Sequence, residues 1–281
     1  MKREAVILFS GGTDSTAATA IAAGLYDQLH LLTFFEDSTA KSPIPTENIE
    51  RLRAAFPNVV FTHSVISTER LVRWLSYGHS PWDYLKHLFR DHVYNLATPG
   101  FSSLSWHLAA LRFATQLRQK GHNVLAVHDG MTRELTHLPG HMPLFREFIA
   151  ELYKKQGFDF SSPVYDFAVP PDQRFVDRMV VDRHGFTLNE ELIPAQRTTG
   201  VYLYERGILP HPNVKGSLFD LRMQHDCYPF VVYNILVFWL LMPVRSWSNI
   251  ESRVVETMKS RLKMCDFLFR NWNHPLFEDP L

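Results

Sequence analysis

The stretch from Ala5 to Ser15, AVILFSGGTDS, constrains the fold more than any other part of the chain. Its first half, residues 5–9, is an unbroken apolar run of strand length, which is typical of a strand buried on both faces of a parallel sheet. Two adjacent glycines follow, and they allow a tight turn and a close approach of the backbone to a ligand. A helix-forming run then continues through Leu25. The stretch therefore predicts a strand, a turn and a helix of a parallel α/β sheet.

The turn and the start of this helix carry the groups of an anion site. The first amides of a helix have no acceptor within it, and the helix dipole adds positive potential there. Hydroxyl side chains in the same segment would complete a phosphate site, and they belong to Ser10, Thr13 and Ser15. The carboxylate of Asp14 fits such a site if it binds Mg²⁺ or caps the helix. The alternative is a capped strand-to-helix turn that binds no ligand.

The hexamer S-G-G-T-D-S resembles the signature of the PP-loop ATP pyrophosphatases, which share a fold with the wider adenine-nucleotide alpha-hydrolase group. It is not a Walker A loop, because no Gly-Lys-Ser/Thr follows. The resemblance implies that the loop holds the pyrophosphate end of ATP, with Mg²⁺ at Asp14, and that AMP is transferred to a substrate oxygen. The motif's fixed positions correspond to Ser10, Gly11, Gly12, Asp14 and Ser15, and Thr13 stands at its variable position.

Further apolar runs alternate with helix-forming segments along the chain. They predict strands at 29–35, 58–66, 124–128 and 164–169, and helices at 46–56, 67–96 with a break at 78–81, 102–120 and 143–156. This order predicts an α/β fold with a parallel, Rossmann-like sheet and helices on both faces, which is the HUP-type fold that the resemblance implies. The Pro-Pro pair at 170–171 predicts a boundary between a nucleotide-binding domain, residues 1–169, and a mainly helical region, residues 170–281, that completes the substrate pocket.

The segment that follows the predicted strand 124–128 is the second informative place. Ligands bind parallel α/β sheets at the carboxyl ends of the strands, and this strand ends in Asp-Gly. The segment loosely resembles the second PP-loop segment, which implies that Asp129 and Gly130 lie near the nucleotide. Arg133 and Glu134 are then candidates for phosphate or Mg²⁺ contacts. The alternative is a simple turn with surface charges.

The end of the predicted strand 29–35 is a third candidate region. In PP-loop proteins the end of the second strand commonly lies beside the adenine, so the resemblance makes Thr33 and Phe34 candidates for an adenine pocket. The alternative for Phe34 is plain core packing, because an aromatic side chain at a strand end usually belongs to the core.

Polar and basic residues gather at 211–227, before the apolar run 228–242. Positive charge would stabilise a leaving pyrophosphate, and Lys215 and Arg222 are the candidates. Cys227, with His225 close by, is a candidate nucleophile or sulfur carrier, although we expect it to be structural and the incoming nucleophile to be nitrogen. The alternative for each residue is a polar loop that caps a buried helix. The apolar run itself is shorter than the roughly 18–20 residues that span a bilayer, so it predicts a buried core helix.

Charge and cysteine content narrow the partners. Lys plus Arg and Asp plus Glu both number 29, and a net charge near zero gives no support to a nucleic-acid or membrane partner, although a local basic patch stays possible. The two cysteines suit a reducing cytosol. The apolar run at the N-terminus is too short for a signal peptide, which predicts a cytoplasmic protein. A homo-oligomer is possible.

The absence of a Cys-x-x-Cys pair and the shortage of cysteines disfavour the zinc-containing and iron–sulfur members of the family. We therefore expect a ligase-type enzyme that splits ATP into AMP and pyrophosphate. It would activate a small-molecule carboxylate or carbonyl oxygen for a nitrogen or sulfur nucleophile. Two alternatives stay open: a tRNA-modifying enzyme, such as a sulfurtransferase or lysidine-type ligase, and a non-enzymatic nucleotide-binding protein.

Overall fold

A five-stranded sheet forms the centre of the protein. The computed structural model describes residues 2–36, 44–78, 80–96, 98–135, 137–165, 198–212, 228–271 and 273–277. Every strand pair in the sheet is parallel, and the order is β3-β2-β1-β4-β5. The strands are β1 (Glu4–Leu8), β2 (Gln28–Phe35), β3 (Val60–Ser67), β4 (Val124–His128) and β5 (Asp159–Ser161). The first four lie within two residues of their predicted bounds.

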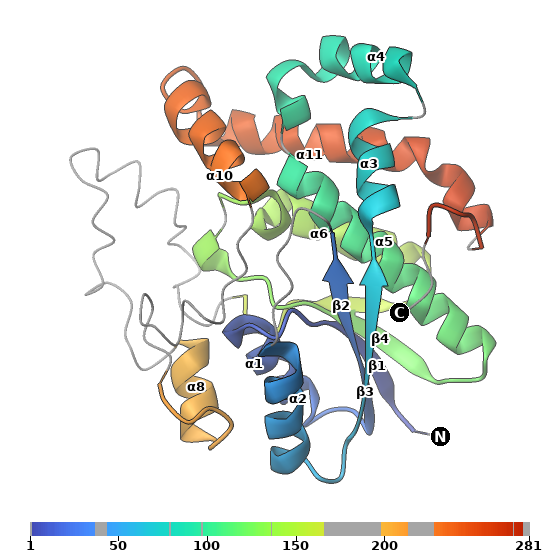
Figure 1. The fold of residues 1–281 in the computed structure, drawn as a ribbon, viewed down its shortest axis with the longest axis vertical. Helices are drawn as coiled ribbons and strands as arrows, with labels where there is room; N and C mark the ends of the chain where they lie inside the picture. Colours follow the sequence, from blue (N-terminus) through green and yellow to red (C-terminus); the bar gives the residue numbers. More distant parts are fainter. Residues whose placement is uncertain are drawn as a thin grey trace.

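Helices connect the strands and cover both faces of the sheet (Figure 1). The α-helices are α1 (Thr13–Ala22), α2 (Ile44–Ala55), α3 (Glu69–Tyr77), α4 (Pro81–Asp91), α5 (Thr98–Gln119), α6 (Pro143–Lys155), α8 (Thr199–Glu205), α10 (Tyr228–Ile235) and α11 (Trp247–Met264). Short 3-10 segments are η1 (His92–Leu96), η2 (Arg133–Leu135), η3 (Pro139–His141) and η7 (Asp266–Arg270), and η6 (Leu236–Leu241) is a π-helix. The expected α/β fold with a parallel, Rossmann-like sheet is therefore confirmed.

Two apolar cores follow from the alternation of side chains along the buried strands. In β1, Ala5 and Ile7 belong to one core, and Val6 and Leu8 to the other. The first core lies under α1, α2 and α8, and the second lies under α3, α5, α6 and α11. Helix α1 is rich in alanine, and four of its alanines are buried in the first core. Small side chains allow this helix to lie close to the sheet.

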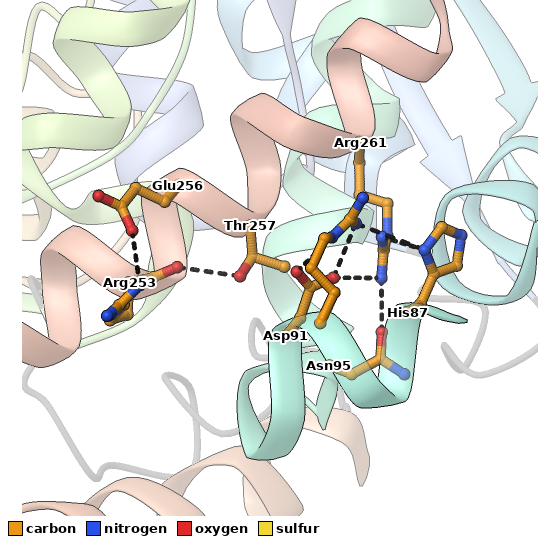
Figure 2. A network of polar contacts seen from close by, with 8 residues as sticks. His87, Asp91, Asn95, Arg253, Glu256, Thr257 and Arg261 are labelled. Atoms are coloured by element: carbon orange, nitrogen blue, oxygen red, sulfur yellow. Dashed lines mark hydrogen bonds and ion pairs between the residues drawn. The ribbon is translucent and has the colours of Figure 1, made fainter. Parts of the chain in front are cut away.

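Helix α11, near the C-terminal end of the chain, packs on the second core. One of its arginines forms hydrogen bonds and an ion pair with α4 and η1 (Figure 2). Arg261 is fully buried, and its guanidinium donates to His87 Nδ1 at 2.6 Å and to Asn95 Oδ1 at 2.7 Å. It also lies 2.9 Å from Asp91 Oδ2. Burial lowers the pKa of Arg261 to about 10, so the side chain stays charged at neutral pH. His87 and Asp91 are four apart on α4 and therefore lie on one side of that helix, and Asn95 reaches the same guanidinium from η1.

The predicted fifth strand at 164–169 is not seen in its described part, since residues 164 and 165 form a turn. The strand β5 begins five residues earlier and pairs with β4 from Ala126↔Asp159 to His128↔Ser161. Gly157, with φ +76°, turns the chain from α6 into it. The sequence pattern misses this strand because it is short and two of its three residues are exposed. Val164, by contrast, is buried in a turn, and residues 166–169 lie outside the described residues.

Two helix predictions also need correction. Helix α5 begins at Thr98, four residues before its predicted start at 102, and Gly100 in its first turn packs closely against Met258 of α11. The apolar run 228–242 is helical, but it is not a fully buried core helix. Tyr233, Leu236 and Val237 are buried, whereas Val232, Ile235, Trp239 and Leu240 are more than half exposed. No helix among the described residues is long and apolar enough to span a membrane.

Candidate functional site

The candidate site lies where the strand order reverses. From β1 the chain adds β2 and β3 on one side and then crosses to add β4 and β5 on the other. In open α/β sheets, ligands bind at the carboxyl ends of the two strands that flank such a switch point. These strands are β1 and β4, and the loops that follow them contain the two segments singled out from the sequence, residues 10–15 and 129–134.

The loop after β1 is held by its own hydroxyl groups. Ser10 Oγ lies 3.1 Å from Ser15 Oγ and accepts a hydrogen bond from the Gly12 N–H at 3.3 Å. Ser15 Oγ donates to Gly12 O at 3.1 Å, and Thr16 Oγ1 donates to the same oxygen at 2.8 Å. Intrahelical bonding of α1 begins with the Thr16 N–H, which donates to Gly12 O at 3.0 Å. The amides of residues 13–15 therefore have no acceptor within the helix.

The backbone conformation of this loop needs its first glycine. Gly11 has φ +81°, and a Cβ atom at this position would lie 2.6 Å from Pro45 Cα. The start of α2 therefore packs directly on the loop. Asn48 of α2 is fully buried and donates from Nδ2 to Gly11 O at 2.7 Å. These contacts fix the loop from the α2 side, while Gly12, Thr13 and Asp14 remain half-buried and Ser10 is exposed.

Asp14 joins the loop to a distant part of the chain. Its Oδ1 accepts a hydrogen bond from Thr199 Oγ1 at 2.6 Å. Thr199 is the first residue of α8, which packs against α1. The carboxylate also lies in the first turn of α1, where the helix dipole favours a negative charge. The structure thus places Asp14 at the expected position and adds a protein partner that the sequence pattern does not indicate.

The loop after β4 touches the loop after β1 through a glycine. A Cβ atom at Gly130 would lie 2.7 Å from both Ser15 Cα and Ser15 N, and 3.0 Å from Asp14 C. No other residue type fits here without moving one of the two backbones. The structure therefore brings Gly130 and the 10–15 loop together, and the expected place of Gly130 near a nucleotide stays a prediction.

Asp129, the neighbour of Gly130, points into the interior. It is 1% exposed, and its Oδ1 accepts a hydrogen bond from the Met131 N–H at 3.2 Å. Its Oδ2 has no hydrogen-bond partner among the described residues and lies 3.8 Å from His107 Nε2. Burial raises the pKa of Asp129 to about 6. Burial also lowers the pKa of His107 to about 3, so this imidazole is neutral and provides no positive charge for Asp129.

His107 and Tyr153 lie behind the switch point and were not predicted. His107 Nδ1 is 3.3 Å from the Tyr153 hydroxyl, which also donates to the backbone oxygen of His107 at 3.1 Å. Both side chains are buried, on α5 and α6 respectively. The only signal in the sequence is a histidine among the apolar residues of the predicted helix 102–120, and that pattern by itself does not reveal its partners.

The remaining candidates of this loop have different surroundings. The Arg133 guanidinium lies over the Tyr165 ring, 4.9 Å from its centroid, and the Arg133 N–H donates to Tyr165 O at 2.8 Å. Arg146 lies over the same ring at 3.5 Å. Arg133 is half-buried, and the side chain of Glu134 lies outside the described residues. Contacts of Arg133 and Glu134 with phosphate or Mg²⁺ stay predictions.

The end of β2 carries a hydroxyl and an aromatic ring that face opposite sides of the sheet. Thr33 Oγ1 donates to Phe9 O at 2.7 Å and lies 2.8 Å from His63 Nε2. Phe34 is half-buried and lies nearly parallel to Trp106, with 6.3 Å between ring centroids and 11° between the planes. Phe34 also packs against the second core. Their proposed contacts with adenine stay predictions.

Glu36, directly after β2, is a buried carboxylate that was not among the predicted site residues. It is 3% exposed and accepts hydrogen bonds from Thr68 Oγ1, Ser102 Oγ and Trp106 Nε1 at 3.1, 2.9 and 2.8 Å. Burial raises its pKa, and these donors oppose the shift. Ser102 and Trp106 tie the end of β2 to α5, and Thr68 ties it to the start of α3. The bond from Trp106 also helps to fix the ring that stacks on Phe34.

The C-terminal candidates Lys215, Arg222, His225 and Cys227 all lie outside the described residues. The described cysteine, Cys265, is buried and not in a disulfide, and burial raises the pKa of its thiol. A thiol with a raised pKa is a poor nucleophile.

Comparison with models of protein families finds no match, and comparison with curated proteins finds none either. Among solved structures, the chain is similar to a predicted subunit of a tRNA methyltransferase from Methanocaldococcus jannaschii. The two are 18% identical, the match covers 75% of this chain and 92% of the other, and the TM-score is 0.34. Similarity of this size carries no inference about activity, so the functional argument relies on the site itself.

Proposed function

We propose that the protein is an ATP-dependent adenylating enzyme that splits ATP into AMP and pyrophosphate. It would activate a carboxylate or carbonyl oxygen of a small molecule, and a nitrogen or sulfur nucleophile would then displace AMP. The proposal combines the resemblance of S-G-G-T-D-S to the PP-loop signature with the geometry at the switch point.

The observation that carries the proposal is the contact between the two loops. Gly130 lies so close to the Ser15 backbone that a Cβ atom would be 2.7 Å away. Both loops therefore lie together at the N-terminus of α1, where the first amides have no acceptor within the helix. A helix N-terminus beside hydroxyl groups and a glycine-lined backbone suits the phosphates of a nucleotide. The residues present thus fit a triphosphate.

Each residue of the loop has a role in this proposal. The amides of residues 13–15 and the hydroxyls of Ser10, Thr13 and Ser15 would hold the pyrophosphate end of ATP. Asp14 would hold Mg²⁺, since a half-buried carboxylate oxygen is a suitable ligand for this hard cation. Bound Mg²⁺ would neutralise charge that develops on the leaving pyrophosphate.

Other residues complete the proposed pocket. Thr33 and Phe34 would lie beside the adenine, and Asp129 would support the loop from behind rather than contact the ligand, because its carboxyl is buried. We keep Lys215 and Arg222 as candidates for the charge that stabilises pyrophosphate, and Cys227 as a candidate structural residue.

Pyrophosphate–ATP exchange tests the proposal. Purified protein with Mg²⁺-ATP and labelled pyrophosphate is offered pools of small carboxylic acids and, separately, total tRNA. We expect label to enter ATP with one acid pool, and AMP rather than ADP to accumulate once ammonia or an amine is added. Label that enters only with tRNA would favour the tRNA-modifying alternative. ADP as the sole product would refute the proposed function, and tight ATP binding with no exchange would favour a nucleotide-binding protein.

The substitution Asp14→Asn tests the role of the carboxylate. The variant should bind ATP and lose Mg²⁺-dependent turnover, because an amide oxygen is a poorer ligand for a hard cation. Asp159→Asn is the matched control, since Asp159 is exposed on the edge strand β5. Full pyrophosphate release by Asp14→Asn would show that Asp14 has no metal or catalytic role.

A further inference from the structure

Three side chains that can bind a metal ion meet near the amino-terminal ends of the strands, opposite the carboxyl ends where the candidate nucleotide site lies. Glu4 begins β1, His30 lies in β2, and His122 precedes β4. Glu4 Oε2 lies 2.9 Å from His30 Nε2 and 2.9 Å from His122 Nδ1. The possible ligand atoms of these three side chains all lie within 4.8 Å of one another. Among the described residues, no other three acidic, histidine or cysteine side chains meet this criterion.

We propose that Glu4, His30 and His122 form a binding site for a divalent transition-metal ion, with Zn²⁺ as the best fit. Two imidazole nitrogens and one carboxylate oxygen suit Zn²⁺ and disfavour Mg²⁺ and Ca²⁺, which prefer oxygen ligands. Three protein ligands leave a fourth tetrahedral position for water or a small anion. No part of this inference depends on the proposed adenylating activity.

The distances allow such a site after a small movement. Zinc bonds of about 2.0–2.2 Å in a tetrahedron separate neighbouring ligand atoms by roughly 3.3 Å. The two nitrogen–oxygen distances, 2.9 Å each, would then lengthen by about 0.4 Å, which small side-chain rotations supply. The two imidazole rings stand at 90° with their centroids 5.5 Å apart, so they approach Glu4 from different directions.

Thr62 provides the outer partner that a metal-binding histidine needs. His30 Nδ1 lies 2.9 Å from Thr62 Oγ1 on the neighbouring strand β3. Without metal, we assign the proton to His30 Nε2, because the Glu4 carboxylate can only accept, and Nδ1 then accepts from the hydroxyl. With metal on Nε2, the proton is on Nδ1 and Thr62 Oγ1 accepts it. A hydroxyl can serve in both states because it is donor and acceptor, and such a partner orients the ring.

Burial gives the site a closed side and an open side. The side chains of Glu4 and His30 are 8% and 4% exposed, whereas that of His122 is 37% exposed, so a metal ion can enter past His122. The ring of Phe113 on α5 lies edge-on to His30, 6.2 Å between centroids, and shields the inner side. Glu4 and Leu8 stand at opposite ends of β1, about 13 Å apart along the strand, so this site is separate from the loop after β1.

Zinc titration of the full chain tests the proposal. The protein is stripped with EDTA and titrated with Zn²⁺ by calorimetry, and Co²⁺ absorption in the visible range reports the coordination geometry. We expect one ion to bind through these ligands and a tetrahedral Co²⁺ spectrum. His122→Ala should weaken binding by about 100-fold or more, and Thr62→Val, which keeps all three ligands, by about 10- to 100-fold.

His211→Ala serves as the control, because His211 is exposed and lies in a different part of the chain. This variant should bind Zn²⁺ like the unmodified protein and should gain the same increase in melting temperature on addition of Zn²⁺, whereas His122→Ala should gain none. Circular dichroism checks that each variant is folded. Equal Zn²⁺ affinity of the unmodified protein and His122→Ala, or no binding up to millimolar Zn²⁺, would overturn the proposal.

Discussion

Asp129→Asn should stabilise the protein more at neutral pH than at acid pH. Burial raises the pKa of Asp129 from 3.8 to about 6, so the folded protein retains this proton to a higher pH than the unfolded chain does. Its contribution to stability therefore falls as pH rises from about 4 to about 6. Asparagine is uncharged at every pH, and its side-chain oxygen can still accept from the Met131 N–H.

The magnitude follows from the size of the shift. A shift of about two pKa units corresponds to about 3 kcal/mol when the carboxyl is fully ionised. At pH 4.5 the same group costs only about 1 kcal/mol, so the stability difference between the two proteins should grow by about 2 kcal/mol between pH 4.5 and pH 7.5. The neutral imidazole of His107 is common to both proteins, and its own pH dependence cancels in the difference.

Thermal melts of both proteins at pH 4.5 and 7.5 measure this quantity. For a chain of this size, about 2 kcal/mol corresponds to roughly 4–8 °C in melting temperature. Asp159→Asn is the control, because it removes a carboxylate that is exposed rather than buried. A gap between Asp129→Asn and the unmodified protein that is the same at both pH values would refute the reasoning, because it would mean that Asp129 titrates normally.

Three further substitutions, one of them with a matched control, test other parts of the structure. Gly130→Ala places a methyl group against the Ser15 backbone, so it should abolish ATP binding in a calorimetric titration while costing about 1–3 kcal/mol of stability. Arg261→Met should lower the free energy of unfolding by about 3 kcal/mol, because His87 and Asn95 lose their buried donor and Asp91 keeps only Arg90 as a cation partner. Arg253→Met on the same helix (Figure 2) should cause no measurable change, since its pair with Glu256 is exposed. Cys227→Ser should retain near-normal turnover and melting temperature, and loss of product with AMP formation intact would indicate sulfur transfer.

The central part of the fold could be predicted because its signals are local. Residues 5–15 encode a buried strand, a glycine turn and a helix start within one short stretch, and the structure has all three. The order of strands and helices then determines a parallel sheet, and with it the edge at which the loops after β1 and β4 meet. The contact of Gly130 with the Ser15 backbone was not itself predicted, although the loose resemblance to the second PP-loop segment had singled out that glycine.

The rest could not be predicted because it depends on contacts between residues far apart in the chain. His107 lies 22 positions before its neighbour Asp129 in the sequence. Thr199 lies 185 positions after its partner Asp14. No local sequence pattern relates the two members of either pair. The apolar run 228–242 shows the same limit: apolarity predicts a helix, but the neighbours of that helix decide which side chains are buried. Strand β5 is missed because an exposed edge strand of three residues carries almost no hydrophobic signal.

The partner of Asp14 also decides which substitution can separate structure from chemistry. The carboxylate accepts a hydrogen bond from Thr199 Oγ1 at 2.6 Å and lies in the first turn of α1. It therefore contributes to the stability of the fold as well as to the proposed metal site. Asp14→Ala would remove both the proposed metal ligand and the link between α1 and α8, and a loss of activity would have two explanations. Asp14→Asn keeps an oxygen that can accept from Thr199 and removes only the charge. Loss of turnover with an unchanged melting temperature in that variant would therefore identify a role for the charge itself.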